Sequence, residues 1–186
     1  MRATFHTLTI LEEIMKGNVN IECTKGDITQ QSDLDAVVNA ANAELRTGGG
    51  VAGAIHRAAG PELEEACRPM APIKPGEAVM SPGFGLPNKK IIHCLGPVYN
   101  IDKPSDQLLA NCYWNALNLA EEARLASLGF PAISTGAFGF PLEEAAEVAA
   151  DAIHSVISDL LHVRLIRMVL FSDSDLQVFR KAFRLN

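Results

Sequence analysis

The sequence has few cysteines and histidines, the residues from which zinc sites are built: four and five, respectively. Among its 186 residues are four cysteines, none in a C-x-x-C pair and none with a second cysteine or histidine at zinc-finger spacing. His93 beside Cys94 is a poor chelating pair, because neighbouring residues of a strand point to opposite faces. We therefore expect no metal and four free, buried thiols, as in a reducing compartment.

Positive charge and long apolar runs are scarce as well. The chain carries 16 Lys and Arg against 22 Asp and Glu, a net charge of −6, which argues against a protein that coats nucleic acid through phosphate contacts. No apolar stretch is long enough to span a bilayer. Glu12 and Glu13 interrupt the apolar N-terminal stretch, which also lacks a signal-peptide cleavage pattern. We expect a cytoplasmic protein, monomeric, that binds neither membranes nor nucleic acid.

Two nucleotide-binding motifs and one hydrolase motif are also missing. The chain has no G-K-[S/T] of a P-loop, and Ser134 does not lie in a G-x-S-x-G elbow. Residues 48–53 satisfy G-x-G-x-x-G, but "NAELRT" separates them from the preceding strand, and residues 68–74 contain no acid that would bind a dinucleotide ribose. The glycines still suit phosphate binding in the way that both nucleotide-binding motifs do. They let backbone amides approach a phosphate at the start of a helix.

The chain length suits one domain with a full core. We expect a single domain over residues 1–186, with 1–18 as an N-terminal extension packing on it. Alternating apolar runs and amphipathic stretches predict a three-layer α/β/α sandwich around a mixed, mostly parallel sheet. The expected strands are 19–28, 35–40, 76–84, 89–96, 128–135 and 164–172. The expected helices are 9–16, 51–59, one that begins at Pro61, 105–127 with Ser105 as its cap, 141–160 and 173–183.

The strand ends carry the functional signal. Glycine and small polar residues follow the apolar runs in "GDI" (26–28), "NAAN" (39–42), "LGP" (95–97), "STGAFG" (134–139) and "FSDSD" (171–175). In open α/β sheets, ligands bind beyond the carboxyl ends of the strands, so we expect these segments to face one cleft. The three glycines 48–50 and "STGAFG" each precede a helix. Two such amide-rich loops suit a diphosphate held from both sides.

At these residues the chain resembles the macrodomain family. The segments "GDIT", "VVNAAN", "GGGVAGAIH", "LGP" and "PAISTGAFGFP" occur in the order typical of the family, and the resemblance runs from about residue 19 to the C-terminus. The chain is similar to stand-alone bacterial macrodomains, with a "GGGVAG" loop like that of viral and archaeal members. The resemblance implies a mixed sheet between helices, ADP-ribose as the ligand and no cofactor.

The resemblance also implies a role for each motif residue. Asp27 would accept a hydrogen bond from the adenine amino group, with Ile28 beside it, and Asn42 would bond the distal ribose. Asn42 and Gly50 would support catalysis. The distal ribose and the diphosphate would contact Gly48, Gly49, Gly50, Val51, Ser134, Thr135, Gly136, Ala137, Phe138 and Gly139, and Phe171 would lie against the adenine.

Several of these residues also have a plainer interpretation. Asp27 after a glycine is typical of a residue that caps or braces a turn, and Asn42 is typical of a turn residue. Phe138 and Phe171 are core residues on composition alone. We expect the histidines to be structural: His56 lies one helical turn from Ala52, and His93 lies on a buried strand.

Ala52 divides the functional alternatives. Many bacterial hydrolytic macrodomains that the chain resembles have an aspartate there, which helps to activate the attacking water, whereas the viral and archaeal members with a similar loop include hydrolases. The favoured hypothesis is an enzyme that removes mono-ADP-ribose from acidic side chains or deacetylates O-acetyl-ADP-ribose, with a water activated partly by a substrate phosphate. The second is a module that binds ADP-ribose or ADP-ribosylated protein without turnover. The third is an RNA- or poly(ADP-ribose)-binding protein, and the acidic charge and the absence of basic-aromatic stripes weigh against RNA.

Overall fold

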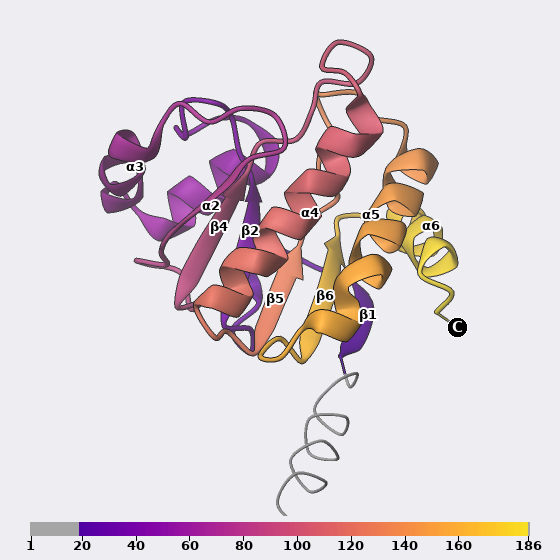
Figure 1. Ribbon diagram of the computed structural model, residues 1–186. Helices are drawn as coiled ribbons and strands as arrows, with labels where there is room; N and C mark the ends of the chain where they lie inside the picture. The colour runs from indigo at the N-terminus through magenta and orange to yellow at the C-terminus, as the bar shows by residue number, and fades with distance from the viewer. Residues whose placement is uncertain (1–18, 186) are drawn as a thin grey trace, which may run out of the picture.

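The computed structural model describes residues 19–185, and its centre is a six-stranded sheet in the order β1-β6-β5-β2-β4-β3 (Figure 1). The strands are β1 (Asn20–Lys25), β2 (Ala36–Ala40), β3 (Ala78–Pro82), β4 (Lys90–Cys94), β5 (Ser127–Phe130) and β6 (Leu165–Leu170). Neighbouring strands pair in parallel except β3 and β4, which are antiparallel. The predicted mixed, mostly parallel sheet is confirmed. The expected helix 9–16 and the N-terminal extension 1–18 lie outside the described residues.

Helices cover both faces of the sheet. They are α2 (Gly50–Ala59), α3 (Glu62–Cys67), α4 (Ser105–Glu122), α5 (Leu142–Val156) and α6 (Asp173–Ala182), with short 3-10 turns η1 (Ile28–Gln30), η2 (Arg68–Met70) and η3 (Ile157–Asp159). Helices α2 and α3 lie on one face, and α4, α5 and α6 lie on the other (Figure 1). The predicted three-layer sandwich is therefore confirmed. None of these helices is long and apolar enough to cross a membrane.

Two buried clusters fill the space between the layers. Successive residues of a strand point to opposite faces. In β2, Ala36 and Val38 accordingly belong to the cluster under α4 and α5, and Val37 belongs to the cluster under α2. All three are fully buried, as expected for a parallel strand covered on both faces.

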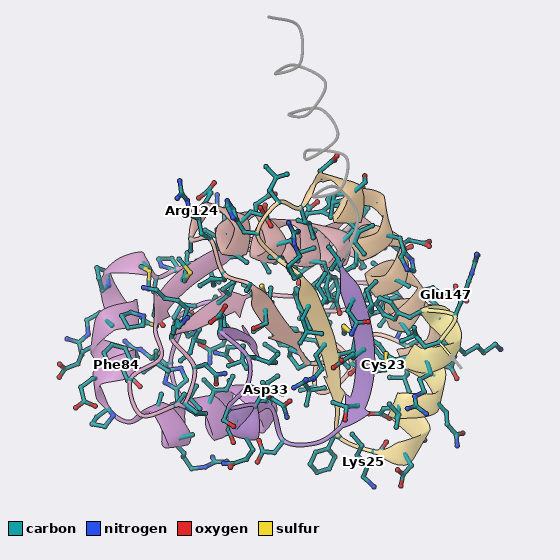
Figure 2. All side chains as sticks on the ribbon, turned by 90° about the horizontal axis from the view of Figure 1, so that it is seen from below. Cys23, Lys25, Asp33, Phe84, Arg124 and Glu147 are labelled. Carbon is teal, nitrogen blue, oxygen red and sulfur yellow. The ribbon has the colours of Figure 1, made fainter. Side chains whose placement is uncertain are left out.

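Helix α4 begins and ends differently from the sequence prediction. Ser105 is not its cap: it is the first helical residue, after Pro104, and its hydroxyl donates to the Asp102 carbonyl oxygen at 2.6 Å. The helix ends at Glu122 rather than near residue 127. Arg124 (labelled in Figure 2) has a φ of 54° and closes a hydrogen-bonded turn of the Schellman type.

Strand β5 is shorter than predicted. It ends at Phe130 instead of residue 135, because Pro131 has no N–H with which to continue the ladder. The residues from Pro131 to Pro141 therefore form the loop that leads into α5, and this loop contains "STGAFG".

The single tryptophan joins two helices on the α4 face. The Nε1 of Trp114, on α4, donates to the Ala152 carbonyl oxygen at 2.9 Å and to the Ser155 hydroxyl at 3.1 Å, both on α5. These bonds satisfy the only polar atom of the indole ring.

Candidate ligand-binding site

Loops of different strands meet at the carboxyl edge of the sheet. The Gly26 N–H, just after β1, donates to the Leu170 carbonyl oxygen at the end of β6 over 2.9 Å. The Tyr99 N–H, in the loop after β4, donates to the Phe138 carbonyl oxygen, also over 2.9 Å. The segments "GDI" and "FSDSD" therefore lie together, as do the loop after β4 and "STGAFG".

The first pair of loops is the expected adenine end. Asp27 caps η1, since its Oδ1 accepts from the Thr29 N–H at 2.8 Å and from the Thr29 hydroxyl at 2.7 Å. The capping interpretation is confirmed, and within residues 19–185 the Oδ2 of this exposed carboxylate has no partner. Ile28 is buried, whereas Phe171 is 91% exposed. The interpretation of Phe171 as a core residue is therefore wrong, and its ring is open to stacking.

Asn42 is held by its own loop. Its Oδ1 accepts from the Arg46 N–H at 3.0 Å, and its Nδ2 donates to the Arg46 carbonyl oxygen at 2.8 Å. The pair closes a tight loop around Leu45, which is buried with a φ of 55°. One amide hydrogen and one oxygen lone pair of Asn42 remain for a ligand hydroxyl.

The glycine loop (residues 48–50) forms the start of α2. Gly49 caps the helix, and Gly50 has a φ of 54°, a conformation that favours glycine. Gly53 is needed for a different reason, because a Cβ there would overlap the Gly48 carbonyl oxygen. The loop thus lies directly against the helix, and the first N–H groups of α2 have no partner within the helix. Val51 is half-buried behind them.

The "STGAFG" loop is strained at its first residue. Ser134 has a φ of 66° and is buried, and its Oγ has no hydrogen-bond partner among the described residues. It lies against Gly96, where a Cβ would overlap that Oγ. A non-glycine residue in this region costs about 1–3 kcal/mol and persists where its surroundings hold it, often at ligand sites. The rest of the loop is more open: Thr135 and Phe138 are half-buried, and Gly136, Ala137 and Gly139 are exposed.

Phe138 brings the two loops onto the same face of the sheet. Its loop follows β5 and precedes α5, yet its ring packs on the cluster beneath α2, as does Val51. The "STGAFG" loop therefore crosses the edge of the sheet toward the side on which the glycine loop lies.

Ala52 and the two histidines lie beneath the glycine loop. Ala52 is 5% exposed, and its Cβ is 3.8 Å from the position that a Cβ on Gly48 would take. His56, one turn further along α2, and His93, on β4, are both buried, with ring centroids 6.5 Å apart. The prediction that both histidines are structural agrees with their burial.

His93 joins three strands through a buried hydrogen-bond chain. Its Nδ1 accepts from the Asn39 amide at 3.1 Å, so its Nε2 carries the proton and donates to the Ser81 hydroxyl at 2.9 Å. Burial lowers the pKa of His93 to about 3 and raises the pKa of the neighbouring Cys67 thiol to about 11. Both groups are therefore neutral at pH 7. The four cysteines are free and buried, as predicted, and within residues 19–185 no three His, Cys, Asp or Glu side chains are grouped to hold a metal.

Two surface hollows lie on the side of the sheet that α2 and α3 cover. One, of about 480 Å³, is lined by Thr29 beside Asp27, together with residues of α2 and of the loop between β3 and β4. The other, of about 340 Å³, is lined by Arg46, to which Asn42 is bonded, and by Glu44, Glu64, Arg68, Ala71 and Pro72. The second hollow lies beside the loop that Asn42 closes, whereas the first reaches the β3–β4 loop at the opposite, amino edge of β4.

Comparison with known proteins identifies the family. The sequence profile of the Macro domain matches residues 38–149. A macro domain-containing protein of Chlorobaculum tepidum is 45% identical over 169 residues, which cover 90% of this chain and 98% of that protein. The chain belongs to the macro domain family.

Solved macrodomains share the fold of this macrodomain. The Oceanobacillus iheyensis macrodomain with ADP is 41% identical, with a TM-score of 0.85, and the match covers 91% of this chain and 94% of that one. The Trypanosoma brucei macrodomain in complex with ADP-ribose is 34% identical, with a TM-score of 0.80, over 87% of this chain and 68% of that one.

Sequence reasoning missed two residues that lie beside the loops of the candidate site in this macrodomain. The Nη1 of Arg57 lies 2.9 Å from the position of a Cβ on Gly53. Its place was readable from the sequence, because residues four apart on a helix are neighbours. Tyr99 bonds Phe138 through its N–H, and its hydroxyl donates to Glu144 at 2.8 Å. No motif signalled Tyr99, because its partners are distant in the chain.

Proposed function

We propose that this macrodomain binds ADP-ribose across the carboxyl edge of its sheet. The observation that carries the proposal is the pair of loops at this edge, the glycine loop at the start of α2 and "STGAFG" with its strained Ser134. Both present backbone amides, which bind a diphosphate without side-chain cations. Such binding is compatible with a net charge of −6.

The two ends of the site fit the two ends of that ligand. Asp27 has a carboxylate oxygen free to accept from an adenine amino group, and the exposed ring of Phe171 follows the neighbouring strand. At the other end, the fixed amide of Asn42 offers a donor and an acceptor to a ribose. Relatives solved with ADP and with ADP-ribose support the assignment.

We further propose that the bound ADP-ribose is released from acidic side chains by hydrolysis. A water oxygen bonds to the anomeric carbon, the bond from that carbon to the carboxyl oxygen breaks, and the side chain leaves as a carboxylate. The proton from the water passes to a phosphate oxygen of the substrate. Asn42 and the glycine loop hold the ribose, so catalysis rests on positioning and electrostatics. For O-acetyl-ADP-ribose, an acetyl ester on the same ribose, the water would instead attack the acetyl carbonyl carbon. The bond from that carbon to the ribose oxygen breaks, the ribose hydroxyl is restored with a proton from the water, and acetate leaves.

Ala52 favours a second candidate, binding without turnover. Solved variants of the Oceanobacillus iheyensis macrodomain replace an asparagine, a glycine and an aspartate, spaced seven and three residues apart. Asn42, Gly49 and Ala52 have the same spacing. By this match Ala52 stands where that relative has the aspartate, and its methyl group cannot accept a proton.

One experiment separates the candidates. A peptide with mono-ADP-ribose on a glutamate is incubated with the wild-type protein or with Asn42→Ala, and free ADP-ribose is measured by mass spectrometry. Calorimetry measures ADP-ribose binding by the wild type. We expect binding, and release above that of the Asn42→Ala control. If the wild type binds ADP-ribose but releases it from the peptide no faster than Asn42→Ala, the non-catalytic binding module is supported and the hydrolase is refuted. If the wild type does not bind ADP-ribose, both candidates are refuted.

A further inference from the structure

Two arginines border the loops at the ribose end of the site. Arg57, on α2, has its Nη1 2.9 Å from the position of a Cβ on Gly53, and the Gly48 carbonyl oxygen lies beside the same position. The long side chain of Arg57 therefore runs back along the helix, over Gly53 and toward the glycine loop. Its guanidinium therefore lies beside the glycine loop, near the expected ribose site. It is not one of the backbone amides that are expected to bind the diphosphate.

Arg46 lies on the loop that Asn42 closes. Its main chain is fixed by the two hydrogen bonds from Asn42, and its side chain lines the 340 Å³ hollow. Because Asn42 anchors it, the arginine has a defined position relative to the residue expected to hold the ribose.

Neither arginine has an ion-pair partner within the described part of the chain. Arg167 shows the contrast: its guanidinium pairs with Glu22 at 3.0 Å and with Asp33 at 2.8 Å, and so is fully used within the fold. Glu44, Glu64 and Arg68 also line the hollow beside Arg46, and none of the three forms an ion pair with another described residue. The guanidinium groups of Arg46 and Arg57 are therefore available to an anionic partner.

We propose that Arg46 and Arg57 bind acidic residues of the polypeptide that carries the ADP-ribose, on either side of the modified carboxyl. The inference rests on the proposed function, because the modified side chain leaves the ligand at the distal ribose, beside Asn42 and Gly48. A target chain must then pass over these loops. With a net charge of −6 the protein as a whole repels an acidic segment. Arg46 and Arg57, with Arg68 in the hollow beside Arg46, favour such a segment locally.

The test compares two peptides of equal length, each with mono-ADP-ribose on a central glutamate. Aspartates flank the glutamate in one peptide, and serines flank it in the other. The readout is the ratio of the two kcat/KM values, or of the two affinities if there is no turnover, so any effect on the shared ADP-ribose cancels. We expect the wild type to prefer the acidic peptide by about fivefold, a size typical of exposed charge pairs. The variants are Arg46→Gln, Arg57→Gln and the double replacement.

Arg124→Gln is the matched control. It removes the same charge from an exposed arginine at the amino end of β5, at the opposite edge of the sheet (Figure 2). We expect the single variants to halve the preference, the double variant to abolish it and Arg124→Gln to retain it. About 1 M salt, where the Debye length is about 3 Å, should also abolish the preference.

Failure of this inference is distinguishable from failure of the proposed function. Equal use of both peptides by the wild type, or a preference that survives in the double variant, would overturn the role of the arginines while ADP-ribose binding stands. A wild-type protein that shows no heat of binding with free ADP-ribose would overturn the proposed function, and this inference with it.

Discussion

The side-chain amide of Asn42 and the main chain of Arg46 exchange two hydrogen bonds, of 3.0 and 2.8 Å. The residue expected to bind the ribose therefore also closes the loop on which it stands. A ligand meets an amide whose position is already set, and little side-chain entropy is lost on binding.

Replacement of Asn42 should change the loop and the affinity together. We expect Asn42→Ala to weaken ADP-ribose binding by about tenfold or more, from lost hydrogen bonds, and to speed amide exchange in residues 43–47. Asn42→Asp should do the same, because it sets a carboxylate oxygen against the Arg46 carbonyl oxygen. Calorimetry and hydrogen exchange measure the two effects. The exposed pair of Gln107 and Asn111 supplies the control Asn111→Ala, and unchanged exchange in Asn42→Ala would contradict the structural role.

Gly53→Ala should destabilise the protein, against the usual trend for a helix. Alanine ordinarily stabilises a helix interior by about 1 kcal/mol relative to glycine. Here its Cβ would overlap the Gly48 carbonyl oxygen, so we expect a loss of about 1–3 kcal/mol, with weaker ADP-ribose binding as the glycine loop shifts. Urea unfolding measures the stability. Gly49→Ala is the control for stability, since its φ of −84° suits alanine and nothing lies within 4 Å of the new Cβ. Stability equal to wild type in Gly53→Ala would mean that the loop moves freely.

The buried histidines should make the fold less stable in mild acid. Burial lowers the pKa of His93 to about 3, and burial also lowers the pKa of His56. Between pH 6.5 and 3 the unfolded chain binds more protons than the folded one, so stability falls as the pH falls. From pH 6.5 to 5, His93 alone should account for a loss of about 1.5 kcal/mol.

Urea unfolding at several pH values measures this slope. His93→Gln should flatten it relative to the wild type, because a glutamine at this position binds no proton in this range. An identical slope in His93→Gln would show that His93 is not the titrating group.

Restoring an acid at position 52 should increase turnover. A positioned general base contributes about 10²–10⁴-fold to a rate, and Ala52 lies directly under the glycine loop. We expect Ala52→Asp to raise the single-turnover rate of ADP-ribose release at least tenfold relative to wild type. Ala52→Asn, of similar shape and without a base, is the matched control. Equal rates for the two variants would mean that the carboxylate does not reach the attacking water.

The sheet and the loops at its edge were predictable because their signals are local. The nearly continuous apolar run at residues 35–40 predicts a covered parallel strand, and parallel strands bring their carboxyl ends to one edge. That geometry places Asp27 beside the loop after β6 and "STGAFG" at the same edge as the glycine loop without any knowledge of tertiary contacts.

Other features of the site could not be predicted, because they depend on contacts between distant segments. Phe171 is exposed because no element within residues 19–185 covers the end of β6, whereas an apolar residue beside a strand ordinarily predicts the core. The partners of His93 come from β2 and β3, up to 54 residues away. Ser105 failed as a cap because Pro104 precedes it and the hydroxyl turns back to Asp102.

Trp114 lies where its fluorescence should report unfolding of the domain but not ligand binding to the native protein. It is the single tryptophan of the chain, bonded to Ala152 and Ser155, and Ala152 lies about 15 Å along α5 from the end that follows "STGAFG". The fluorescence emission of Trp114 therefore reports the packing of α4 on α5. The native emission is lost when the whole domain unfolds. ADP-ribose should leave the native emission spectrum unchanged and raise the midpoint of the melting curve recorded by the same fluorophore. A thermal-shift screen on intrinsic fluorescence thus needs no added dye and no engineered probe.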